Sequence, residues 1–242
     1  MQDKSLRSLT LASAAALVAA FALVFAYAPL DADQGLIQKI FYLHVPLAIV
    51  SLCGFMAGGI MAVRHLHTGD RAHDLRSYVA IHLSLILGLG VLATGAIWAK
   101  ASWGAWWVWD EPTLVSFLIV FLLFACYQPL RFSIDDPERQ ARYAAVFAII
   151  GGAFVPLNFL AVRLASSLIH PRVLSTTGGE MPGSMRLTFL VSFLAMVCLF
   201  VTLWKYELAS KHASMRLRAL KRALAGEDAA GPLARTAAPT QL

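Results

Sequence analysis

The chain is short of charged residues. Asp, Glu, Lys and Arg make up 14% of its 242 residues, whereas a soluble domain carries about 25%. Hydrophobic residues make up 59%, and they stand in long runs rather than in alternation. This composition excludes an ordinary soluble domain and predicts a membrane protein of one domain that crosses the bilayer several times. The basic residues form no compact patch interleaved with aromatic residues, which argues against binding to nucleic acid.

Cysteine is scarce as well. Cys53, Cys126 and Cys198 are far apart, and the sequence has neither a C-x-x-C nor a C-x-x-C-H motif. This pattern argues against a redox dithiol and against haem attached covalently to this chain. The sequence also lacks the G-x-x-x-x-G-K-[ST] loop that cradles nucleotide phosphates, so any ATP hydrolysis must come from a partner.

Long apolar runs are what the chain has in quantity. A helix of about 20 apolar residues crosses the roughly 30 Å of hydrocarbon in a bilayer. Six runs reach that length, at about residues 9–28, 36–63, 78–99, 113–132, 143–164 and 185–206. We therefore predict an all-α membrane protein, a polytopic bundle of six transmembrane helices within residues 1–207. Residues 208–242 are interpreted as a cytoplasmic basic amphipathic helix, lying on the membrane surface, followed by a disordered tail.

The distribution of Lys and Arg predicts the orientation in the membrane. With the N-terminus inside, most of the 20 basic residues fall on the inner side. Those outside are Lys39, Lys100, Arg163, Arg172 and Arg186. This asymmetry follows the positive-inside rule and places both termini in the cytoplasm. The triplet at residues 26–28 resembles a signal-peptidase site, but the apolar run before it is long for a signal peptide, so we favour an uncleaved first helix.

Four of the six tryptophans stand in one segment, WGAWWVWD at residues 103–110, which we call the Trp stretch. The charge rule places it in an outer loop between the third and fourth spans. Its polar, aromatic and glycine residues are Trp103, Gly104, Trp106, Trp107, Trp109 and Asp110. Gly104 permits close approach of a ligand, and Asp110 can cap the helix that begins near Pro112. The indole rings either form an aromatic belt in the lipid interface or cover a flat apolar ligand or partner.

Two histidines fall on the same outer side. His44 lies in FYLHVP at the start of the second span, and His170 lies in SSLIHPRV after the fifth. Two neutral imidazoles can ligate haem iron from its opposite faces, and a porphyrin is a flat disc that indole rings match. His44 alone fits an ordinary core histidine equally well, and His170 alone is more typical of an ordinary loop histidine. Together with the Trp stretch on one side, they favour a ligand site.

The Trp stretch resembles the Trp-rich WWD signature of proteins that handle haem in cytochrome c maturation. With six spans and 242 residues, the chain is similar to the heme exporter protein C (CcmC) family over residues 9–207. The YLHVP segment at residues 42–46 resembles the setting of that family's first outer histidine. His170 stands at the place of the second.

This resemblance implies that b-type haem binds non-covalently at the outer face of a prokaryotic plasma membrane, with His44 and His170 as axial iron ligands. The Trp stretch would then form the haem platform and the docking surface for a periplasmic-side haem chaperone. The chain would work with the ATPase and membrane subunits of an ABC transporter and would not be an enzyme. The alternative is a non-haem membrane scaffold or transporter subunit whose Trp stretch is an interfacial anchor in membrane lipid.

The residues after the Trp stretch depart from the family pattern. Many relatives have an Arg there, as in WDARLT, whereas this chain has Glu111 and Pro112 in WDEPTLVS. Such an Arg would pair with a haem propionate or within the loop. We expect another outer cation to replace it, first Arg172, because it is nearest to His170 in sequence. The other candidates are Lys39, Lys100 and Arg163.

Overall fold

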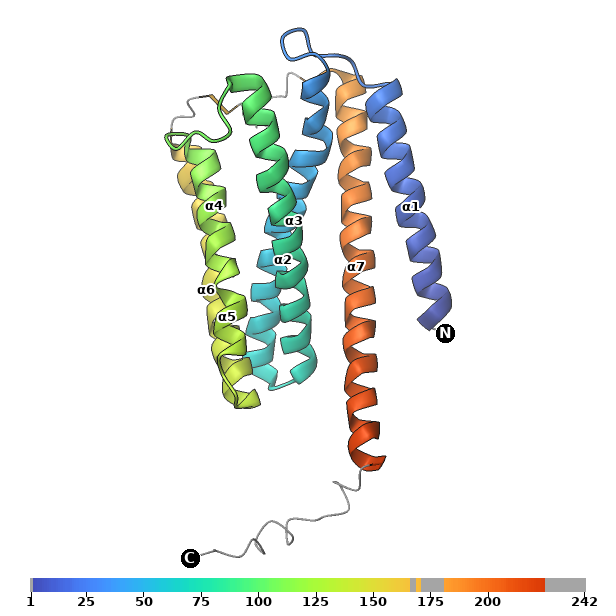
Figure 1. Cartoon of the computed structure of the whole chain (residues 1–242), viewed down its shortest axis with the longest axis vertical. Coiled ribbons are helices and arrows are strands. Elements are labelled where there is room, and N and C mark those ends of the chain that lie inside the picture. The colour runs from blue at the N-terminus through green and yellow to red at the C-terminus, as the bar shows by residue number, and fades with distance from the viewer. Residues whose placement is uncertain (1, 166–168, 171–180, 225–242) are drawn as a thin grey trace, which may run out of the picture.

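The computed structural model describes residues 2–165, 169–170 and 181–224, and helices dominate these residues (Figure 1). They are α1 (Gln2–Ala26), η1 (a 3-10 helix, Leu36–Ile40), α2 (Phe41–Thr68), α3 (Arg71–Trp103), α4 (Pro112–Ala125), α5 (Tyr127–Phe132), α6 (Pro137–Leu164) and α7 (Gly183–Leu224). Six helical segments of the described residues are long and apolar enough to cross a membrane, with α4 and α5 forming one of them. The predicted bundle of six membrane-spanning helices is confirmed.

The observed helices extend beyond the apolar runs, because capping residues rather than hydrophobicity set where a helix ends. α3 begins at Arg71 instead of near residue 78. The Asp70 side chain caps it by accepting a hydrogen bond from the Ala72 N–H at 2.8 Å. Gly69, with a φ of 72°, terminates α2 just before this cap. The connection between α2 and α3 is therefore only two residues long.

The last helix, α7, continues past residue 207, where the sequence analysis divides the chain. Residues 208–224 extend it without a break. The segment extends beyond the rest of the bundle (Figure 1), and its location on a membrane surface stays a prediction. It contains no Gly or Pro and is rich in Ala, Leu, Lys and Arg, which favour an uninterrupted helix. The predicted disordered tail, residues 227–242, lies outside the described part.

α2 lies centrally, packed between α3 and α6. At Gly59 of α2 and Gly152 of α6 the two backbones approach so closely that a Cβ on Gly59 would lie 3.2 Å from the Gly152 Cα. Small residues allow such close helix packing in membranes. Beside this contact, the rings of Phe55 and Phe124 stack with their centroids 4.0 Å apart. This packing fixes α2, and with it the position of His44 in its first turns.

A buried ion pair joins α3 and α5 at the end of the bundle opposite the Trp stretch. The two terminal nitrogens of the Arg131 guanidinium each donate to one oxygen of the Asp74 carboxylate at 2.7 Å. Nη1 also donates to the Tyr127 hydroxyl at 3.1 Å. Each of the two charged side chains is only 10% exposed. A bidentate geometry of this kind makes the pair directional as well as strong.

Candidate functional site

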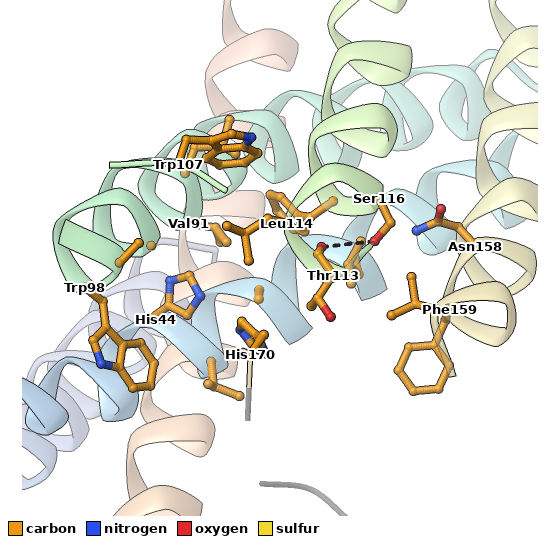
Figure 2. Close-up of a pocket in the computed structure, with 18 of the residues that line it drawn as sticks. His44, Val91, Trp98, Trp107, Thr113, Leu114, Ser116, Asn158, Phe159 and His170 are labelled. Carbon is orange, nitrogen blue, oxygen red and sulfur yellow. Dashed lines mark hydrogen bonds between the residues drawn. The ribbon is translucent and has the colours of Figure 1, made fainter. Parts of the chain in front are cut away.

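A mostly apolar cavity, which we call the two-histidine cavity, lies between α2, α3, α4 and α6 at the end of the bundle that carries the Trp stretch. Its empty space is about 1500 Å³, which includes the open mouth. His44 from α2 and His170 from the segment after α6 both line it (Figure 2). The aromatic residues of the lining are Phe41, Trp98, Trp103, Trp107, Phe117 and Phe159. The fold thus brings together the two histidines that the sequence singled out.

A hydrogen bond fixes the ring of His44. Its Nδ1 lies 2.9 Å from the Thr94 Oγ1 of α3, and the Thr94 hydroxyl itself donates to the Gly90 carbonyl at 2.7 Å. Since the hydroxyl proton is used by that carbonyl, the Thr94 oxygen accepts the Nδ1 proton of His44. This tautomer leaves Nε2 with the lone pair that a metal ion requires.

Two further residues of α3, neither of them expected from the sequence, hold His44. A Cβ on Gly95 would lie 2.9 Å from the His44 Cε1, so the imidazole rests directly on the glycine. The Trp98 ring meets the imidazole edge to face, with centroids 5.8 Å apart. The Trp98 Nε1 in turn donates to the Gln34 side-chain carbonyl at 2.7 Å. Thr94, Gly95 and Trp98 share one face of α3 by helical spacing. This shared face is the feature of the sequence that could have indicated them.

The second histidine is held from a different direction. Its main-chain N–H donates to the Glu111 Oε2 at 3.2 Å, and the N–H of Ile169 donates to the same oxygen at 2.9 Å. The His170 ring contacts the Trp103 ring edge to face, with centroids 6.2 Å apart. Trp103 therefore connects the Trp stretch to the second candidate ligand.

Glu111, rather than Asp110, caps α4, so the prediction that Asp110 caps this helix was wrong. The Glu111 side chain is fully buried, and its Oε1 lies 3.4 Å from the Thr113 N–H. Asp110 is exposed at the surface. Pro112 occupies the first turn, as predicted. The Glu111 side chain turns inward and contacts both α4 and the His170 segment. The Asp110 side chain faces outward.

The Trp stretch is neither a helix nor an extended strand. α3 ends at Trp103, and Gly104 follows in a left-handed conformation with a φ of 77°. The following turn divides the tryptophans into two pairs. Trp103 and Trp107 line the two-histidine cavity, whereas Trp106 and Trp109 are 60% and 71% exposed. The stretch therefore presents one pair of indoles to the cavity and another to the surroundings.

Only one of the candidate cations that the structure describes lies in the cavity wall. Arg163 lines the cavity, with its guanidinium 5.1 Å from the centroid of the Phe159 ring. Lys39 is buried and donates to the Val24 carbonyl in the last turn of α1 and to the Ala28 carbonyl just after it. Lys100 donates to the Gly104 carbonyl. Arg172, our first choice, lies outside the described residues.

The donor set restricts what metal species the described residues suit. They contain no group of three or more His, Cys, Asp or Glu side chains placed to hold a metal ion. Two imidazoles at one apolar cavity instead suit a metal that brings its own equatorial ligands, as haem iron does. The buried Nε1 of Trp107 has no hydrogen-bond partner among the described residues, so it is a donor available to a ligand.

Six membrane-length helices with a two-histidine cavity at one end define a multi-pass helical membrane protein with a ligand site at that end. Its sequence matches the family described as heme exporter protein C over residues 1–223. It is 32% identical to the heme exporter protein C of Bradyrhizobium diazoefficiens over 200 residues, 81% of this chain and 74% of that protein. For the Paracoccus denitrificans protein, identity is 30% over 194 residues, 79% of this chain and 80% of the relative. For the Escherichia coli K12 protein, identity is 30% over 160 residues, 66% of this chain and 65% of the relative. The chain belongs to the heme exporter protein C family, as its motifs predicted.

Proposed function

We propose that this protein binds haem in the two-histidine cavity, at the outer face of a bacterial plasma membrane, and passes it to a haem chaperone during maturation of c-type cytochromes. Membership of the heme exporter protein C family supports a role in haem export. The observation that carries the proposal is the meeting of His44 and His170 at one cavity. The protein is a transport component rather than an enzyme, and haem is its cargo.

The cavity offers each part of a haem a suitable neighbour. The Nε2 of His44 and the imidazole of His170 would be the axial ligands of the iron. Trp103 and Trp107 would cover the apolar faces of the porphyrin, beside the backbone of Gly104. Arg163 is the cation best placed for a propionate. The haem is held without covalent attachment, because the chain has no C-x-x-C-H motif.

The exposed part of the Trp stretch supports the docking of a chaperone. Trp106, Trp109 and Asp110 lie at the surface next to the cavity, and exposed aromatic residues are enriched at protein interfaces. A chaperone bound there would stand beside the haem that it receives. ATP-hydrolysing and membrane subunits of an ABC transporter would supply the energy for release, since this chain has no phosphate-binding loop.

A second function remains compatible with one part of the site. Trp106 and Trp109 are exposed in a way that suits the headgroup region of a bilayer, where Trp is enriched. A scaffold anchored in lipid through these rings would need neither histidine. The histidine variants therefore separate the two functions.

The test is the absorption spectrum of the protein purified in detergent from cells supplied with haem. We expect a Soret band in the wild type that is shifted or lost in His44→Ala and in His170→Ala. His67→Ala is the matched control, because His67 is exposed at the opposite end of α2. An equal band in all four proteins would contradict the axial-ligand assignment and would favour the lipid anchor.

A further inference from the structure

Glu111 is a buried acid that neither the family resemblance nor the haem site accounts for. A carboxylate in an apolar interior is costly unless hydrogen bonds compensate for the lost water. The side chain is fully buried and accepts main-chain hydrogen bonds from two parts of the chain. One is the first turn of α4, through the N–H of Thr113. The other is the segment of Ile169 and His170, and Ile169 is 58 residues from Glu111 in sequence.

These bonds act on the part of the site that the helices do not hold. His44 stands within α2, but His170 lies beyond the end of α6 at Leu164. Two consecutive N–H groups, those of Ile169 and His170, converge on one carboxylate oxygen. Hydrogen bonds to an ionised acceptor are about twice as strong as neutral ones. The carboxylate therefore fixes the main chain from which the His170 imidazole projects.

We propose that Glu111 is a positioning residue that places the second histidine for the ligand of the two-histidine cavity. This inference rests on the proposed function, because the position matters only when both histidines ligate one iron. Glu111 is not part of the cavity lining and acts through His170. Metal ligands depend on such supporting hydrogen bonds, and losing one typically costs about 10- to 100-fold in metal affinity.

Two variants of Glu111 test the proposal. Glu111→Leu replaces the carboxylate with an apolar side chain of similar size and so removes both acceptor oxygens. We expect its ferric haem to change from the low-spin spectrum of two imidazole ligands to the high-spin spectrum of one, with the haem dissociation constant raised about 10-fold or more. Added imidazole restores the low-spin spectrum by filling the vacated iron position. Glu111→Gln keeps one carbonyl oxygen that can accept the two N–H groups, and we expect it to retain most of the low-spin form.

The matched control is Asp70→Ala, which removes the cap of α3 at the opposite end of the bundle. Both variants lose a helix cap, but Asp70→Ala leaves the hydrogen bonds of the His170 segment in place. We therefore expect Asp70→Ala to have the haem spectrum of the wild type. A low-spin spectrum and unchanged affinity in Glu111→Leu would overturn the positioning role while leaving the proposed function standing. A wild-type protein whose Soret band does not depend on His44 or His170 would overturn both.

Hydrogen exchange gives a readout that needs no haem. In the haem-free protein, the amides of Ile169 and His170 should exchange faster in Glu111→Leu than in the wild type, because their acceptor is gone. Asp70→Ala should leave these two amides unchanged. Equal exchange in the wild type and Glu111→Leu would show that the carboxylate does not hold this segment, and it would overturn the proposal independently of any spectrum.

Discussion

At the scale of single residues, the hydroxyl of Thr94 determines which nitrogen of His44 is free. Thr94→Val preserves the shape of the side chain and removes the acceptor of the Nδ1 proton. We expect haem affinity to fall about 10-fold, as for other ligands that lose an orienting hydrogen bond. Thr94→Ser, which keeps the hydroxyl, should bind nearly as the wild type does. Haem titration followed by absorbance measures both, and equal affinities for Val and the wild type would refute this role.

Gly95 gives a steric test of the same histidine. In Gly95→Ala the new methyl group would lie 2.9 Å from the His44 Cε1, so the ring must move. We expect the Soret band to weaken or shift in the purified protein. Gly90→Ala in the same helix is the control, because its methyl group would meet Leu47 at an ordinary 3.5 Å. Similar spectra for the two variants would mean that the position of the ring is unimportant.

Arg163 can be tested with a modified ligand. We expect Arg163→Gln to weaken binding of haem but to leave binding of haem dimethyl ester unchanged, because the ester has no carboxylate for a guanidinium to pair with. Titration of both ligands against both proteins gives a double-mutant cycle. An equal loss for haem and its ester would assign Arg163 to packing rather than to a propionate.

At the scale of helices, the buried ion pair of Asp74 and Arg131 ties α3 to α5 away from the cavity. Removing one partner of a buried pair typically costs about 3–5 kcal/mol, because the other charge is left uncompensated. We therefore expect Asp74→Ala to lower the thermal midpoint in detergent markedly. Replacing both residues with Leu should recover much of the loss.

The haem spectrum of folded Asp74→Ala protein should be unchanged, since the pair lies far from His44 along the bundle. The measurement is a thermal melt followed by circular dichroism, combined with an absorption spectrum below the transition. A stable Asp74→Ala protein would contradict the structural role of the pair.

The helices also show what a sequence can predict. Long apolar runs gave the six spans, because crossing a bilayer requires length and hydrophobicity that are visible in the sequence. The choice between Asp110 and Glu111 as the cap of α4 was not predictable, since both residue types accept hydrogen bonds and only tertiary packing decides which one turns inward. The contacts of Thr94, Gly95 and Trp98 with His44 were hidden for the same reason: they join two helices.

At the scale of the whole molecule, the orientation in the membrane stays a prediction from the charge distribution. After replacement of the native cysteines by Ala, single cysteines at Asp33 and Asp135 can report it, because the two positions lie in connections at opposite ends of the bundle. We expect a membrane-impermeant maleimide added to intact cells to label Asp33→Cys and not Asp135→Cys. The reverse pattern would place the Trp stretch in the cytoplasm.

The length of α7 connects the cavity to the far end of the molecule. Its 42 residues make a rod of about 63 Å, roughly twice the thickness of the hydrocarbon layer. Near its first turn, Phe189 stacks on Phe41, which lines the two-histidine cavity. At its other end, the basic segment stands clear of the bundle (Figure 1). Because one unbroken helix joins the two ends, a tilt of the basic segment would also shift Phe189 against the Phe41 wall of the cavity.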